Sequence, residues 1–192
     1  GVASSIDPNK DMYIDNKTQE QILTRKGVLK AEKGFRVEVK PMLDTLTSVR
    51  TAVSKVYAGL KGRNGVGDIA AINAYQRLID PAVVRSDDVR LLQSANDLMS
   101  KLELFKDNAK KGDVLSDKLR LEVSNMAKTL LSAGSDGPME SLLGRLDIAE
   151  ANKGIRRSQI VAKRVLDFIK KPIQIPTYLK TVEELQAEAA GK

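Results

Sequence analysis

The 192-residue chain carries 32 basic and 25 acidic side chains, a net charge of +7, and it contains neither Cys nor His. This excludes disulfides, thiolate chemistry, metal sites built from Cys or His, and the most common general base. Hydrophobic residues make up 42% of the chain but aromatic residues only 4%, so the core must be mainly aliphatic, as suits packed helices. Composition therefore favours an all-α protein and makes an enzyme the less favoured class.

The positive charge is concentrated toward the end of the sequence. Residues 151–192 hold 9 basic and 4 acidic side chains (net +5), whereas residues 1–150 hold 23 and 21 (net +2). A basic segment on a nearly neutral body suits an element that faces phosphates or a membrane surface. No apolar run approaches the roughly 18 residues that a membrane span needs.

The chain opens with a polar, turn-rich segment, which we expect to be an N-terminal arm over residues 1–15. Its sequence is not that of a signal peptide, and because it does not begin with Met we expect a processed chain or a piece of a longer polypeptide. Side chains between Asp7 and Asp11 are spaced like the first ligands of a calcium loop. Met12 stands where that loop needs Gly, and Thr18 where it needs Glu. We therefore expect no metal and no cofactor.

The first helical stretch is expected to begin with Asn16 as its N-cap and to run through residues 21–33. Gly34 is expected to end it. Residues 35–39 alternate like a strand without an evident partner, so we interpret them as an extended connector.

Pro41 suits the first turn of the next helix. Apolar residues then recur at helical spacing as far as Leu60, which predicts a helix of roughly twenty residues, about 30 Å long. Gly59–Gly67 contains four glycines, but it follows a helix and lacks the Gly-Lys-Ser/Thr of a phosphate-binding loop. We interpret it as a mobile link between helices in which Arg63 is available for anion contact.

A helix over residues 68–79 is expected to stop at the Asp80-Pro81 corner, because proline cannot continue the helical hydrogen bonding. Ser86 is expected to cap the next helix, whose buried stripe covers residues 89–105, before a polar turn. Tyr57 and Tyr75 lie beside the apolar stripes, and we expect their hydroxyls to point outward.

The next helix is expected to start at Ser116-Asp117. Gly134–Pro138 is interpreted as a stop followed by a new start, and a kink or break is expected near Asn152–Gly154. Lys171–Pro176 should be extended, and a capping box at Thr181 should open a short terminal helix.

These elements predict an all-α fold, an irregular multi-helix bundle of about six or seven helices with extended arms at both ends. We expect the N-terminal arm at residues 1–15, a helical domain at 16–171, and an extended segment plus a short C-terminal helix at 172–192.

The clearest candidate site is a set of basic residues that fall in pairs seven positions apart. On one continuous helix they and Lys153 would occupy about 140° of one face, interrupted only by Asp167 and Ile160. We predict phosphate or partner contacts for Lys153, Arg156, Arg157, Lys163, Arg164, Lys170 and Lys171. Three interpretations remain open: a solvated face, non-specific contact with nucleic-acid phosphates, or contact with anionic lipid or an acidic partner subunit.

Glu140-Ser141 is a second, weaker candidate. A Glu followed by Ser at a helix end occurs around the catalytic acid of lytic transglycosylases, but the neighbouring residues here do not match. One carboxylate without an apolar pocket has no reason to act as a general acid. A fragment of a peptidoglycan-acting enzyme is therefore the least favoured function.

Residues 71–102, AINAYQRLIDPAVVRSDDVRLLQSANDLMSKL, resemble a helical segment of virion proteins in tailed bacteriophages, including internal, DNA-ejection and tail-associated proteins. The similar features are the Asp-Pro corner, the Val-Val-Arg-Ser-Asp-Asp start and the Leu/Gln/Ser/Ala-rich helix. The resemblance implies a component made in the bacterial host cytoplasm and located in the virion, where it assembles with copies of itself and other virion proteins. It implies no catalytic residues.

Together, these observations suggest a non-enzymatic structural component of a tailed-phage virion that forms a homo-oligomer and helps hold or convey DNA during ejection. The alternative is a helical nucleic-acid-binding module that uses the basic face of residues 153–171. Membrane contact is less favoured than either.

Overall fold

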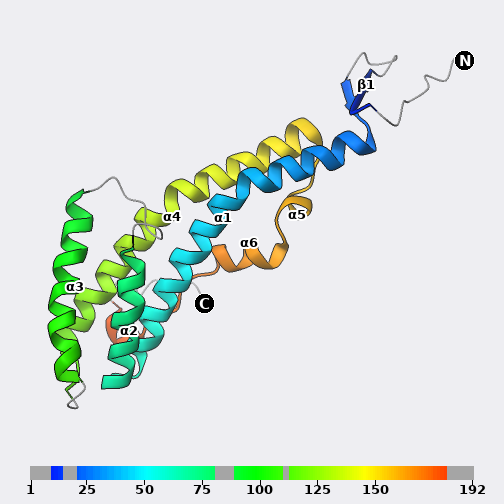
Figure 1. The fold of residues 1–192 in the computed structure, drawn as a ribbon. Coiled ribbons are helices and arrows are strands. Elements are labelled where there is room, and N and C mark those ends of the chain that lie inside the picture. Colours follow the sequence, from blue (N-terminus) through cyan, green and yellow to red (C-terminus); the bar gives the residue numbers. More distant parts are fainter. Residues whose placement is uncertain (1–9, 15–20, 81–88, 110–112, 181–192) are drawn as a thin grey trace, which may run out of the picture. The chain divides into compact units, whose positions relative to one another are not determined.

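We describe residues 10–14, 21–80, 89–109 and 113–180 of a computed structural model, shown in Figure 1. These ranges confirm the all-α class and add one short antiparallel strand pair. None of their helices combines the length and apolarity that a membrane crossing requires. The elements are β1 (Met12–Ile14), β2 (Gln21–Leu23), α1 (Arg25–Lys61), α2 (Gly65–Leu78), α3 (Val89–Ala109), α4 (Asp117–Lys153), α5 (Arg157–Ile160), α6 (Lys163–Lys170) and the 3-10 helix η1 (Thr177–Leu179).

The chain divides into two compact units. Unit 1 comprises residues 1–44 and 138–170, and unit 2 comprises residues 45–137 and 171–192. Helices α1 and α4 contribute to both units, so each unit is described separately below. The domain boundaries expected from the sequence stay predictions.

In unit 1, Thr24 caps the start of α1. Its Oγ1 accepts a hydrogen bond from the Gly27 amide at 3.1 Å and donates one to the Lys10 carbonyl at 2.5 Å. A Cβ on Gly27 would lie 1.9 Å from the carbonyl oxygen of Asp11, so glycine alone fits here. The expected Asn16 cap lies outside the described residues, and residues 21–23 form a strand rather than a helix.

The expected helix end at Gly34 and extended connector at residues 35–39 are wrong, because α1 continues through both. Phe35 and Val39 are separated by four positions and so share a helical face as readily as a strand face; Val39 is buried, whereas Val37 is 66% exposed. Pro41 lies inside α1 rather than at its first turn. The carbonyl that loses its partner there belongs to Val37, which is exposed to solvent.

The expected stop and restart at Gly134–Pro138 is also wrong, since α4 is continuous from Asp117 to Lys153. Proline disfavours the helical conformation of the preceding residue partly through that residue's Cβ. Here the preceding residue is Gly137, which has no Cβ, and space around it is open. The sequence thus reduces the steric cost of an internal proline. Ser116-Asp117 was correctly predicted as the start of this helix.

Unit 2 packs the later part of α1 against α2, α3 and the first part of α4 (Figure 1). Helix α2 ends at Leu78, immediately before the predicted corner, while Pro81 and Ser86 lie outside the described residues. Helix α3 extends to Ala109, beyond the start of the expected polar turn. The core of unit 2 is largely aliphatic, as the composition predicted.

Both predictions for the tyrosine hydroxyls are wrong. Tyr57 is buried and donates to the Ser124 carbonyl of α4 at 3.2 Å; Tyr75 is buried and donates to the Ala95 carbonyl of α3 at 3.0 Å. Each hydroxyl therefore satisfies a carbonyl of a neighbouring helix, and burial raises the pKa of Tyr75.

A buried ion pair joins α2 to α4 inside unit 2. The side chain of Asp68 is 0% exposed and that of Arg120 is 4% exposed. Two guanidinium N–H groups donate to the carboxylate at 3.0 and 2.8 Å, and the Leu115 amide donates at 2.8 Å. The hydrogen bonds to Asp68 raise the pKa of Arg120. Three donors compensate for removing the Asp68 carboxylate from water.

Residues 171–176 are non-helical, as predicted, and lead into η1, whose Leu179 belongs to the unit 2 core. Leu179 is buried, and the Tyr178 hydroxyl donates to the Leu60 carbonyl at 2.6 Å. Arg63, predicted as available for anion contact, lies 4.7 Å from the centre of the Tyr178 ring and pairs with Asp117 at 2.5 Å. The segment is thereby anchored at the α1–α2 turn.

Candidate nucleic-acid interface

The predicted basic face begins where α4 ends. Gly154 adopts φ +62°, a left-handed conformation that favours glycine, and its amide donates to the Glu150 carbonyl at 3.1 Å. Ile155 follows and is buried. This confirms the expected break near Asn152–Gly154, and it leaves Lys153 exposed at the last position of α4.

Short helix α5 is fixed to α1 within unit 1 by the side chain of Gln159. Its amide nitrogen donates to Glu32 Oε1 at 2.6 Å, and its Oε1 accepts from the Arg156 amide at 2.8 Å. Arg36 of α1 donates through Nε to the Gln159 carbonyl at 2.8 Å. Arg156 contributes its main chain to this arrangement and leaves its guanidinium exposed.

Arg157 differs from the other predicted basic residues because its charge is already paired. Its Nε donates to Glu150 at 2.8 Å and its guanidinium also pairs with Asp147, both on α4. The hydrogen bond that Arg157 donates to Glu150, together with the nearby charge of Asp147, raises the pKa of Arg157. The Arg157 side chain thus holds α5 against α4.

A second break separates α5 from α6. Val161 is extended, with φ −126° and ψ 128°, and α6 begins at Lys163. Ile160, which interrupted the predicted basic face, is the last residue of α5 and is buried. The prediction of a single basic helical face is therefore wrong: the residues lie on three helices and the links between them.

Exposed basic side chains nevertheless remain clustered in sequence within unit 1. Within the described part of the chain none of them forms an ion pair, and Asp167 is the only acidic residue between 151 and 171. These exposed residues are Lys153, Arg156, Lys163, Arg164 and Lys170. Lys171 is also exposed but belongs to unit 2. Unpaired, solvated cations can exchange small counterions for phosphates without breaking any internal contact.

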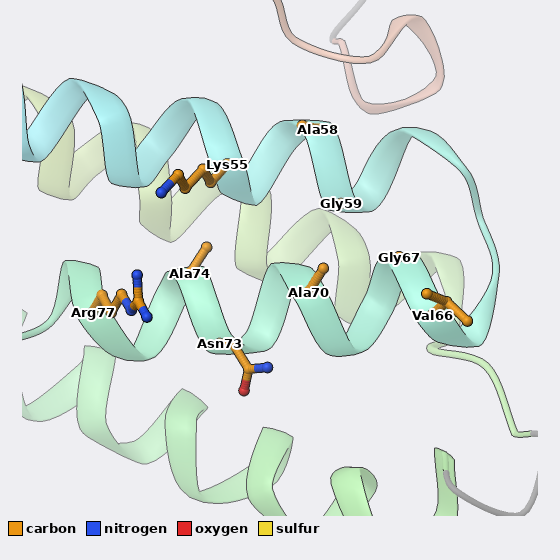
Figure 2. Close-up of a pocket in the computed structure, with 9 residues that line it drawn as sticks. All are labelled: Lys55, Ala58, Gly59, Val66, Gly67, Ala70, Asn73, Ala74 and Arg77. Atoms are coloured by element: carbon orange, nitrogen blue, oxygen red, sulfur yellow. The ribbon is translucent and has the colours of Figure 1, made fainter.

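Two basic residues that the prediction did not include lie at a groove of unit 2 (Figure 2). The groove has a volume of about 510 Å³ and runs between α1 and α2, with Lys55 and Arg77 at one end. Both residues lie off the apolar stripes of their predicted helices, which marked them as exposed. Their convergence depends on the close packing of the two helices, which no local pattern specifies.

Glu140-Ser141, the second candidate from the sequence, lies on α4. Both residues are exposed, so the carboxylate lacks the apolar pocket that a general acid needs. Among the residues with a described placement, no cluster of acidic side chains is suited to a metal ion. Most of the calcium-like segment lies outside that part of the chain.

Comparisons with protein-family models, with curated proteins and with solved structures found no match to this chain.

Proposed function

We propose that this chain is a non-enzymatic structural component of a tailed-phage virion that assembles with copies of itself and holds DNA through its exposed basic residues. The observation that carries the DNA-binding part is the group Lys153, Arg156, Lys163, Arg164 and Lys170, exposed and without acidic partners among the described residues. Arg157 is left out of the contact set because Asp147 and Glu150 already neutralise it.

Binding through such a group depends on charge rather than on base sequence. Each Lys or Arg that reaches a phosphate displaces condensed counterions, so affinity falls as salt rises. Aromatic side chains for base stacking are few, at 4% of the chain, which argues against sequence-specific recognition of single strands. This kind of contact suits a protein that holds or conveys DNA of any sequence.

The virion and assembly parts of the proposal rest on the resemblance of residues 71–102 to tailed-phage virion proteins. Exposed large apolar side chains on α3, Val89 at 74% and Leu104 at 76%, offer points of contact for a neighbouring subunit. These side chains support assembly without specifying its symmetry.

A charge-removal experiment tests the DNA-binding part. The test variant combines Arg156→Gln, Lys163→Gln, Arg164→Gln and Lys170→Gln, and the matched control combines Lys33→Gln, Lys61→Gln, Lys101→Gln and Lys118→Gln, which removes the same charge elsewhere. Fluorescence anisotropy with a short labelled duplex at low salt should show binding by the wild type and the control, and strongly weakened binding by the test variant. Equal weakening in both variants would show a general charge effect and refute the assignment.

Mass photometry of the purified chain tests assembly, for which we expect a discrete oligomer. A monomer that still binds DNA through these residues would favour the alternative, a helical nucleic-acid-binding module. That alternative is supported by the exposed basic residues of unit 1, which lie within one copy of the chain. A monomer that does not bind DNA at low salt would refute both functions.

A further inference from the structure

The groove of unit 2 runs between α1 and α2, which approach closely at two glycines. A Cβ on Gly59 would lie 2.6 Å from the Ala71 nitrogen, and a Cβ on Gly67 would lie 2.4 Å from the Gly59 carbonyl oxygen. The groove therefore has a floor without long side chains to fill it. Alanines line this floor on both helices: Ala58, Ala70 and Ala74 (Figure 2).

The two ends of the groove differ in character. At one end Lys55 and Arg77 project from opposite helices, and within the described ranges neither has an acidic partner (Figure 2). At the other end Val66 is 82% exposed, the most exposed of the large apolar side chains in these ranges. An occupant that fits the whole groove presents a carboxylate at one end, an apolar side chain at the other, and little bulk between them.

One exposed face of α4 in unit 1 has these features in that order. Glu140, Gly144 and Ile148 follow one another at spacings of four, so they share one side of the helix. All three are exposed, Ile148 at 43%, and a Cβ on Gly144 would meet nothing within 4 Å. Among the described residues Glu140 has no basic partner, in contrast to Asp147, which pairs with Arg157.

We propose that this face of α4 in one copy of the chain docks into the α1–α2 groove of a second copy. In an antiparallel arrangement Ile148 packs on Val66, and Gly144 lies over Ala70. The lack of a side chain at Gly144 lets the two helix backbones approach closely. The Glu140 carboxylate then meets the two cations at the far end of the groove.

The two surfaces agree in spacing and in charge. Val66, Ala70 and Ala74 repeat on α2 the spacing of four that the face of α4 shows. Eight residue steps span about 12 Å on either helix, so both ends meet at once. Ala74 lies between the cations Lys55 and Arg77 in the view of Figure 2. Opposite charges at this end orient the encounter and fix which ends meet.

Nucleic acid is a poorer occupant of the same groove. A phosphate backbone needs a track of cations, whereas this groove offers Lys55 and Arg77 above an uncharged floor. The inference rests on the proposed assembly of copies and is independent of DNA binding, which we assign to residues 153–170. Because the two docking surfaces differ, one copy can use both at once, so the contact can extend an assembly beyond a pair.

Because the chain contains no Cys, two full-length single-cysteine chains test the contact between copies. Chains with Ala70→Cys and Gly144→Cys are mixed under reducing conditions, which allows subunit exchange, and are then oxidised mildly. The matched control mixes Ala70→Cys with Asn125→Cys, an exposed position elsewhere on α4. Affinity tags of different length separate mixed from unmixed disulfide products on a gel. We expect the mixed product of the first pair to form about tenfold faster or more than that of the control pair, because docking raises the effective concentration of the two thiols.

Charge reversal in the same chains tests the ionic contact. Adding Glu140→Lys to the Gly144→Cys chain should lower the cross-linking rate to that of the control pair. Adding Lys55→Glu and Arg77→Glu to the Ala70→Cys chain should then restore the rate. Circular dichroism checks that each variant keeps its helical content, and Glu140→Gln, a milder change, should lower the rate in the same direction.

Mass photometry of the wild type separates failure of this contact from failure of assembly. A mixed product that forms no faster than the control pair, in a chain that is oligomeric, would overturn this contact and leave the proposed assembly standing. A monomeric wild type would overturn both. Weaker DNA binding after Lys55→Glu and Arg77→Glu, with an unchanged cross-linking rate, would overturn the proposal by assigning the groove to nucleic acid.

Discussion

The buried ion pair between Asp68 and Arg120 gives the most quantitative prediction for stability. Arg120→Met keeps an unbranched side chain of similar length but removes both hydrogen bonds to Asp68, at 3.0 and 2.8 Å. The carboxylate then remains 0% exposed with the Leu115 amide as its one remaining described hydrogen-bond donor. Its burial is no longer compensated.

Removing one partner of a buried pair typically costs about 3–5 kcal/mol. We expect that loss for Arg120→Met. The double variant Asp68→Leu/Arg120→Met removes both charges and leaves the Leu115 amide unsatisfied, which costs about 1–3 kcal/mol. The double variant should therefore be more stable than the single one. Asp117→Asn is the control, because Asp117 is a surface partner of the same guanidinium at 59% exposure, and such pairs contribute little.

Urea unfolding followed by far-UV circular dichroism measures these free energies. A loss below about 1 kcal/mol for Arg120→Met would contradict the reasoning, because it would place the cost within the range of exposed pairs. So would a double variant less stable than the single variant, since it would mean that the charges do not compensate each other.

Three further predictions follow from packing, titration and pairing. Gly59→Ala should lower the free energy of unfolding by about 1–3 kcal/mol through overpacking against α2, whereas Gly144→Ala, with open space around its Cβ on α4, should raise it by about 0.5–1 kcal/mol in urea titrations. Burial raises the pKa of Tyr75 above its usual 10.0, so the stabilising contribution of the neutral Tyr75 hydroxyl is fully present below pH 10 and is lost as pH rises further. The urea midpoint of unfolding should therefore fall above pH 10, and it should fall less steeply in Tyr75→Phe. Arg157→Gln should lower the thermal unfolding midpoint because it removes the pairing with α4, but it should leave DNA affinity and its salt dependence unchanged; a weaker affinity would place Arg157 in the contact set.

Long amphipathic stripes made the helical fold predictable from sequence. The apolar positions between residues 42 and 60 recur at helical spacing, and those from Val49 to Leu60 are buried in the core of unit 2. Helix starts and ends with strong local signals were also found, including Asp117, the end of α2 and the break at Gly154. Each of these signals acts within one or two turns of the chain, where contacts between neighbouring residues determine the backbone conformation.

The errors occurred where a local breaking signal was overridden by the rest of the fold. Gly34 and Pro41 normally interrupt a helix, but continuing α1 buries Val39 in unit 1. Gly137 and Pro138 behave similarly within α4. Propensity is a weak prior in such cases because tertiary burial contributes more than a single residue's preference.

Part of the candidate site could not be predicted because it depends on contacts between distant residues. The basic residues were identified from composition, but their common face required a continuous helix, which Gly154 and Val161 interrupt. The pairing of Asp68 with Arg120 spans 52 positions. A partial signal existed, since Asp68 falls on the same helical face as buried Ile72 and Tyr75, where a carboxylate requires a partner.

The salt dependence of DNA affinity tests the central claim most directly. For the wild type, the logarithm of the association constant should fall linearly with the logarithm of salt concentration, with a slope of about −0.9 for each phosphate contacted on duplex DNA. Replacing Arg156, Lys163, Arg164 and Lys170 by Gln should flatten the slope by about 0.9 for each phosphate that the variant no longer neutralises, whereas the matched control should keep the wild-type slope. Equal slopes for the wild type and the test variant would contradict the assignment of DNA binding to these residues.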